Sequence, residues 1–343
     1  MSGRLSRLFH ASLGLSLGLC VSCAPGPAVS PARPQALVVS DRGGAWRVYE
    51  IDPLEGTARL VGSPRADDRS YQDSMPARLP DGRIVFVSDR AGNPEIYLAP
   101  SGGDTLERLT VDPDRKDLAA ADSDPAPLGR DRIVFARGEP GAPGGAPRDL
   151  FVLRPGQAEA RRLTRAPADD HAPWGSPDGR QVVFVSDRSG KPRLYLMTDL
   201  ESTDPESSLL DLSGRSPPGA GPLSQGADFV DSAPTFLPDG SIVFSRAPAE
   251  GPPHLYVAGP PGTRAGLRQI TDSLTLPFGA DEPVILPDRT ILLVTGPFAP
   301  PSGKVEAVPF AVYRIATGGF NLTRVTRERA GYNDLTRRLS PRP

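Results

Sequence analysis

Five aspartates stand at nearly the same distance before a proline and could bring carboxylates together in the folded chain. They are Asp73, Asp122, Asp170, Asp231 and Asp281. The proline follows three residues after each of the first four and two residues after Asp281. Crowded carboxylates attract a cation or the basic end of a peptide. Short aspartate side chains also cap turns by accepting backbone amide hydrogen bonds, so the pattern predicts either a binding ring or a repeated structural contact.

Histidine is the other residue type that could support catalysis, and beyond the amino-terminal segment the sequence has only His171 and His254. His171 directly follows Asp170, and with a bound metal this pair could serve a lyase or hydrolase acting on carbohydrate. The same part of the chain has no GxSxG, HExxH, P-loop or GxGxxG motif. We therefore expect a binding protein with no catalytic residues and no required cofactor, and the carbohydrate enzyme is the alternative.

Residues 1–22 have the pattern of a signal peptide that directs export. Arg4 and Arg7 precede an apolar run, Leu8–Leu19, that is too short for an ordinary membrane anchor and is followed by small residues. Lys and Arg together number 39 against 41 Asp and Glu, which does not favour a general nucleic-acid binder. The composition thus predicts an exported protein without a nucleic-acid partner.

The two cysteines of the chain, Cys20 and Cys23, lie at the end of the signal segment. Their C-x-x-C spacing has no second ligand pair and no βαβ context, which disfavours a zinc or redox site. The stretch "LCVSC" instead resembles a bacterial lipoprotein signal with Cys23 as the lipid acceptor; a plain cleaved signal is the alternative. Residues 23–35 then form a lipidated cysteine and a Pro-rich tether, and attachment by two or more acyl chains would hold the protein stably on a membrane.

An internal repeat of about 50 residues organises the rest of the sequence. Its clearest copies begin with proline and contain "PDG", an apolar run, and a form of "VSDRxGxPxxYL". In the first full copy we predict strands over residues 77–79, 84–87, 95–99 and 106–110, separated by turns. A single small four-stranded sheet cannot bury both faces, so the copies must pack on one another, as blades of a β-propeller do.

The repeat "PDGRIVFVSDRAGNPEIYLAPSGGDTLERLT" resembles that of the TolB-like β-propeller family, and the resemblance covers nearly all of residues 36–326. It implies an all-β fold of four-stranded antiparallel blades. It also implies a protein or peptide partner in the cell envelope. The amino-terminal α/β domain of TolB has no counterpart, because the repeats begin directly after the tether.

Six blades result when the two ends of the chain are combined. The copy that begins at Ala36 has three strand signals and lacks the first, whereas "YNDLTRRLSP" near the carboxyl terminus aligns with "QDSMPARLPD". We predict that Leu335–Leu339 supplies the missing strand, so that residues 36–343 form one propeller closed by its C-terminal strand.

The innermost strand comes first in each blade, which predicts that the five aspartates and His171 surround one mouth of the central channel. A cation bound there is possible, although the sequence specifies no metal. We assign the Asp and Arg of the "SDR" copies to structure, as a turn and inter-blade pairing set: Asp89/Arg90, Asp187/Arg188 and Asp41/Arg42. Long loops are expected on the same face as the aspartates, at residues 138–148, 214–230, 247–253 and 296–309.

These observations predict an envelope lipoprotein whose propeller acts as a non-catalytic scaffold for a protein or peptide. Ala24 after the acceptor cysteine lacks the aspartate that retains enteric lipoproteins at the inner membrane. The expected location is the outer membrane, facing the periplasm or the surface.

Overall fold

The computed structural model describes residues 36–325 with internal gaps. The gaps are residues 41–42, 52–56, 63–67, 101–104, 112–120, 139–146, 158, 214–227, 261–262, 264–265, 287 and 296–310. The predicted signal peptide, Cys23, the tether and the closing strand Leu335–Leu339 lie outside the described residues.

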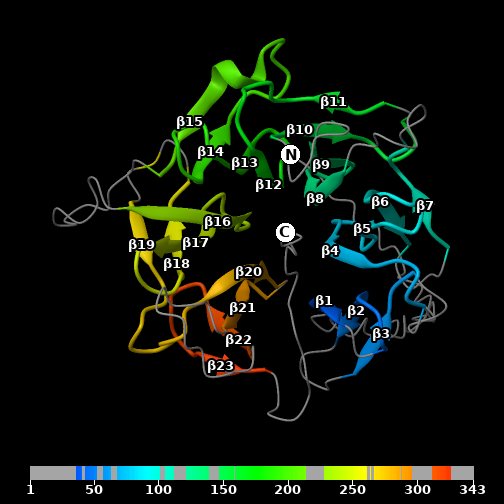
Figure 1. Ribbon diagram of the computed structural model, residues 1–343. Helices are drawn as coiled ribbons and strands as arrows, with labels where there is room; N and C mark the ends of the chain where they lie inside the picture. Colours follow the sequence, from blue (N-terminus) through cyan, green and yellow to red (C-terminus); the bar gives the residue numbers. More distant parts are fainter. Residues whose placement is uncertain are drawn as a thin grey trace, which may run out of the picture. The chain divides into compact units, whose positions relative to one another are not determined.

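The described part of the chain is built almost entirely from short antiparallel strands (Figure 1). Blades 1 to 3 contain β1 (Ala36–Ser40), β2 (Arg47–Ile51), β3 (Ala58–Leu60), β4 (Asp73–Arg78), β5 (Ile84–Ser88), β6 (Glu95–Ala99), β7 (Glu107–Arg108), β8 (Asp122–Leu128), β9 (Arg132–Gly138), β10 (Arg148–Leu153) and β11 (Arg161–Arg162). Blade 4 contains β12 (Asp170–Gly175), β13 (Val182–Ser186), β14 (Arg193–Met197), the 3-10 helix η1 (Pro205–Ser208) and β15 (Leu209–Asp211). Blades 5 and 6 contain β16 (Phe229–Phe236), β17 (Ile242–Pro248), β18 (His254–Ala258), β19 (Leu267–Gln269), β20 (Asp281–Ile285), β21 (Thr290–Thr295), β22 (Ala311–Ala316) and β23 (Thr323–Arg324).

The predicted all-β, six-bladed propeller is confirmed. Each sheet is a simple meander in which consecutive strands pair, and the six sheets surround a common centre (Figure 1). Five sheets have four strands, and within the described residues blade 1 has the three strands β1, β2 and β3. The fourth strand predicted for blade 1 falls on residues outside the described ones.

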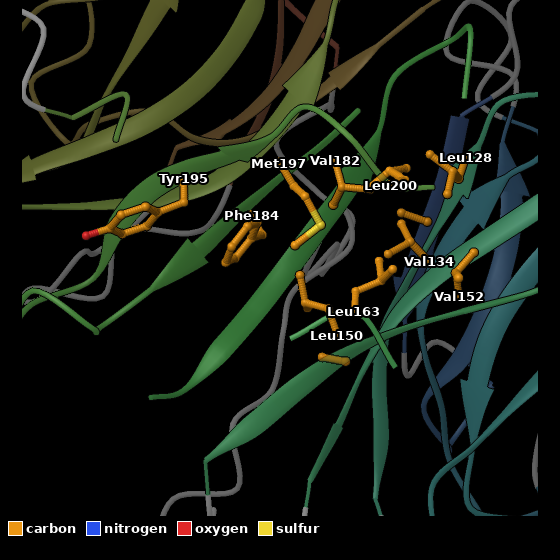
Figure 2. Packing of buried hydrophobic residues seen from close by; sticks show 12 residues of the cluster. Leu128, Val134, Leu150, Val152, Leu163, Val182, Phe184, Tyr195, Met197 and Leu200 are labelled. Atoms are coloured by element: carbon orange, nitrogen blue, oxygen red, sulfur yellow. The ribbon is translucent and has the colours of Figure 1, made fainter. Parts of the chain in front are cut away.

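The cores lie between blades, because each cluster of buried apolar residues draws its members from two neighbouring sheets. Figure 2 shows the cluster shared by blades 3 and 4, in which Leu128, Val134 and Leu150 pack with Phe184 and Met197. Equivalent clusters join blades 4 to 5, 5 to 6, 1 to 2 and 2 to 3. A sixth cluster joins blade 6 to blade 1, so the ring of packed interfaces is complete.

The two middle strand predictions for blade 2 hold, whereas the innermost strand starts earlier than predicted and the outermost, β7, covers only Glu107–Arg108 of the predicted 106–110. β5 and β6 begin and end within one residue of the predicted bounds, whereas β4 starts at Asp73 rather than at Ala77. The strand passes Pro76 because a β-bulge interrupts its register with β5 between Ser74 and Ala77. A bulge accommodates the missing amide of a proline, which a regular ladder does not.

Candidate functional site

One face of the propeller carries the start of the first strand, the second turn of each blade and the connections between blades. We call this the loop face. In blade 2 the register places Asp73 opposite Ser88, and Ser88 opposite Glu95, so these residues lie at the loop-face end of their strands. Of the long loops expected on this face, residues 247–253 are described, whereas most of residues 138–148, 214–230 and 296–309 lie outside the described part.

A left-handed residue stands before the proline in five innermost strands. These residues are Met75 (φ 51°), Asp124 (φ 54°), Ala172 (φ 55°), Ala233 (φ 46°) and Glu282 (φ 52°). Positive φ is uncommon for residues other than glycine, so its recurrence marks a backbone shape that the surrounding blades impose. The aspartate of each motif is therefore part of the bulged strand itself and does not precede it as predicted.

Four of the five aspartates that the sequence singled out are bound by an arginine of their own blade. The pairs are Arg90 with Asp73, Arg137 with Asp122, Arg188 with Asp170, and Arg246 with Asp231. In blade 5 the arginine is bidentate: Arg246 Nε lies 2.7 Å from Asp231 Oδ1, and its Nη2 lies 3.1 Å from Oδ2. All four carboxylates are buried. Burial raises the pKa of Asp122 and of Asp170, although arginine hydrogen bonds act in the opposite direction.

These aspartates also connect neighbouring blades. Ser213, at the end of blade 4, donates from Oγ to Asp231 Oδ2 of blade 5 over 2.5 Å. The backbone amide of Asp122 donates to the carbonyl of Pro94 in the preceding blade over 3.0 Å, and Asp231 does the same to Pro192 over 3.1 Å. The recurring aspartate thus connects one blade to the next. Charge-assisted hydrogen bonds of this kind require the partner groups to be held in a fixed geometry.

The arginine of each pair additionally covers two aromatic rings of its blade. In blade 2, Phe86 and Tyr97 stack with centroids 6.2 Å apart, and the Arg90 guanidinium lies 5.0 Å from the Tyr97 centroid. Blades 3, 4 and 5 repeat this arrangement. The turn predicted at "SDR" is confirmed for Asp89, whose carbonyl accepts from the Gly92 amide and whose Oδ1 accepts from the Gln72 amide over 2.6 Å. The predicted inter-blade ion pairing is wrong for Arg90, which pairs with Asp73 of its own blade. Asp187 and Arg188 act likewise, and Asp41 and Arg42 lie outside the described residues.

Asp281 differs from the other four aspartates. The residue opposite it on the second strand is Val294, where blades 3 and 5 have Arg137 and Arg246. The Asp281 carboxylate accepts from the Glu282 amide over 2.8 Å and from Ser232 Oγ over 3.5 Å. Within the described residues it forms no ion pair with an arginine or lysine, and it is only partly buried.

A polar cluster between blades 3 and 4 includes His171. Arg148 donates to both carboxylate oxygens of Asp169 over 2.8 and 2.7 Å, and its Nη1 lies 3.5 Å from Asp124 Oδ2. His171 Nδ1 lies 3.3 Å from Asp169 Oδ2. Although burial favours the protonated acid, hydrogen bonds from Arg148 and His171 hold the pKa of Asp169 well below its ordinary value. An ionised carboxylate therefore orients the histidine.

The carbohydrate-enzyme alternative paired His171 with Asp170, but the structure does not bring these side chains together. They are consecutive on β12, so their side chains lie on opposite sides of the strand. Asp170 is fully buried against Arg188, whereas the His171 side chain is 19% exposed and contacts Asp169. The described part of the chain contains no group of three or more His, Cys, Asp or Glu side chains that could hold a metal ion.

Sequence reasoning missed Arg148, Asp169 and two aromatic side chains that each contact two arginines. The Tyr71 centroid lies 3.9 Å from the Arg47 guanidinium and 4.6 Å from that of Arg90, and the Phe229 centroid lies 3.6 Å from that of Arg193 and 3.8 Å from that of Arg246. Both aromatics stand two residues before an inner-strand aspartate. That shared position is the signal that could have identified them. In a separate result, no helix among the described residues is long and apolar enough to cross a membrane.

Comparison with known proteins links the chain to TolB. No family model matches it. It is 30% identical over 146 residues to a Protein TolB homolog of Chlorobium luteolum, which covers 33% of this chain and 34% of that protein. It is 44% identical over 54 residues to the Tol-Pal system protein TolB of Bordetella pertussis, covering 16% and 12%. The chain thus matches about a third or less of the length of these curated relatives.

Solved structures agree on the fold. TolB from Acinetobacter baumannii superposes with a TM-score of 0.59 at 18% identity, covering 83% of this chain and 61% of that one. A puromycin-hydrolyzing peptidase from Mycobacterium tuberculosis gives 0.52 at 18% identity, covering 87% and 44%. At such identities the likeness shows the fold alone. Together, the repeat sequence, the six-bladed structure and the partial matches to TolB relatives identify this chain as a TolB-like β-propeller.

Proposed function

We propose that this chain is a non-catalytic scaffold that binds a protein or peptide partner in the bacterial envelope. The observation that carries the proposal is the role of the charged residues in the TolB-like repeat. These residues form ion pairs and hydrogen bonds that hold the blades together, and they do not form a catalytic group. Rigid scaffolds of this kind present binding residues on their loops. Relatives named as Tol-Pal system proteins support an envelope setting.

The binding surface in this proposal is the loop face. Asp73, Asp122, Asp170 and Asp231 serve it indirectly by holding the blades in register. Asp281, which has no arginine opposite it, and His171, which is partly exposed, are the members of the predicted ring that would contact the partner. No bound cation is required for such contacts.

Photo-crosslinking in cells tests this assignment with two exposed positions of the same blade. Ser189 lies in the loop-face turn of blade 4, and Thr203 lies in the turn between its third and fourth strands, on the opposite face. A photoreactive residue at position 189 should capture one defined protein, and the same residue at position 203 should not. Equal capture at both positions, or none at position 189 and its loop-face neighbours, would contradict the proposal.

We also propose that Cys23 is lipidated and anchors the propeller to the outer membrane, facing the periplasm or the surface. The lipoprotein-like signal and the following tether support this, because two or more acyl chains give stable attachment. An alkyne fatty acid fed to cells should label the mature protein, and the label should be lost in Cys23→Ser. Labelling that survives the substitution would overturn the anchor.

A further inference from the structure

The connection from blade 5 to blade 6 displays two large apolar side chains on the loop face. Leu274 is 95% exposed and Phe278 is 50% exposed. Leu276 and Ala280, which alternate with them, are buried in the cluster shared by blades 5 and 6. We call Leu274 and Phe278 the apolar ridge. The ridge is therefore exposed on a segment whose opposite side is packed into the core.

Local hydrogen bonds fix the shape of this connection. Asp272 Oδ1 accepts from the amides of Leu274 and Thr275 over 3.1 and 2.9 Å. The Leu276 amide donates to the Asp272 carbonyl over 2.8 Å, and the Gly279 amide donates to the Leu276 carbonyl over 2.9 Å. A loop held in this way keeps the ridge in place before any partner arrives, which lowers the entropic cost of binding.

Backbone hydrogen bonds connect the ridge segment, through residues 247–253, to residues 228–230 of blade 5. The Ala280 amide donates to the Pro253 carbonyl over 2.7 Å, and the Ala249 amide donates to the Asp228 carbonyl over 2.7 Å. Val230, which follows Asp228 by two residues, is 40% exposed. Of the six exposed large apolar side chains in the described part of the chain, Leu274, Phe278 and Val230 therefore belong to one sector of the loop face.

The charged residues of this sector are all acidic. Residues 228–230, 247–253 and 271–282 contain no lysine or arginine, and their acids include Glu250, Asp272 and Asp281. The other two acids are Asp228, which pairs with Lys191, and Glu282, one of whose carboxylate oxygens is buried. Nearby cations are already engaged: Lys191 pairs with Asp228, and the guanidinium groups of Arg193 and Arg246 stack on Phe229. The surface is therefore apolar with an acidic surround.

Resting on the proposed function, we propose that the apolar ridge binds a segment of the partner protein that carries both apolar and basic side chains. Apolar contact supplies the burial, and lysines or arginines of the partner face the acidic surround. A second copy of the chain would set acid against acid at a symmetric contact. An anionic lipid surface would be repelled by the same carboxylates.

Binding of designed peptides to the purified full-length chain tests the proposal. The probe is a fluorescent twelve-residue peptide of alternating leucine and lysine, followed by fluorescence polarisation at moderate salt. Wild type should bind it at least about tenfold more tightly than the variant Leu274→Ser/Phe278→Ser, given the apolar area that the ridge offers. Phe320→Ser is the matched control, because Phe320 is 72% exposed on the opposite face, and this variant should bind as wild type does.

Three outcomes would overturn the proposal: equal affinity of wild type and the ridge variant, equal binding of a leucine–glutamate peptide, or ridge-dependent binding of anionic vesicles in place of the peptide. Unchanged thermal unfolding of the ridge variant shows that its fold is intact. Failure of this proposal can be distinguished from failure of the proposed function, because crosslinking at position 189 and at other loop-face positions tests partner binding without using the ridge.

Discussion

At the scale of single residues, the buried aspartates show how a repeated charge can serve the architecture. Asp231 is 1% exposed and is surrounded by Arg246 of its own blade and Ser213 of the preceding one. A buried carboxylate is tolerated when a well-placed cation and hydroxyl replace its water. Such a contact depends on geometry, and it constrains the angle between two neighbouring blades.

This dependence predicts a large penalty when the arginine is removed. Arg246→Met leaves the Asp231 carboxylate buried without its cation and should lower the free energy of unfolding by about 3–5 kcal/mol in urea titrations. Arg314→Met is the control, because its pair with Asp288 is partly exposed (30% and 39%) and should be worth about 0–1 kcal/mol. Adding Asp231→Asn to Arg246→Met should restore part of the loss. Equal small effects of Arg246→Met and Arg314→Met would show that the buried pair does not support the fold.

At the scale of elements, blade 1 is the unusual one. Its described sheet has β1 as the innermost strand, whereas the other blades have a bulged strand in that place. We expect Leu335–Leu339 to take that position, because "YNDLTRRLSP" matches the region that forms β4 in blade 2.

Truncation tests this closure. Removal of residues 332–343 should lower the melting temperature by about 10 °C or more, since losing a strand costs several kcal/mol in a domain of this size. Removal of residues 341–343 alone is the control and should leave the melting temperature unchanged. Closure by this strand would be refuted by similar melting curves for the two truncated proteins.

At the scale of the whole molecule, the sequence was sufficient for the fold and only partly sufficient for the contacts within it. The "PDG" turn and the following apolar run predicted the position of β5 almost to the residue. The start of β4 was wrong because nothing in the sequence marks Met75 as left-handed, and a proline ordinarily ends a strand.

The polar contacts were harder to predict because equivalent arginines come from different places. Arg90 follows the second strand in a turn, whereas Arg137 lies within the second strand itself, yet both bind the aspartate of their own blade. The contact between Arg148 and Asp169 joins residues 21 positions apart on neighbouring blades. Spacing along the chain therefore located the aspartates and could not assign their partners.

The sharing of every core between two blades has a consequence for how the chain folds. Most interfaces join segments that are close in sequence and can be completed in order as the chain is made. The interface of blade 6 with blade 1 is different, because it joins Ala36 and Val38 to Leu292 and Val312, more than 250 residues away. Contacts between residues so far apart in sequence form slowly. The apolar side of β1 that packs on blade 6 therefore stays exposed until blade 6 has formed. Until that contact forms, both ends of the nascent ring expose apolar surface to aggregation.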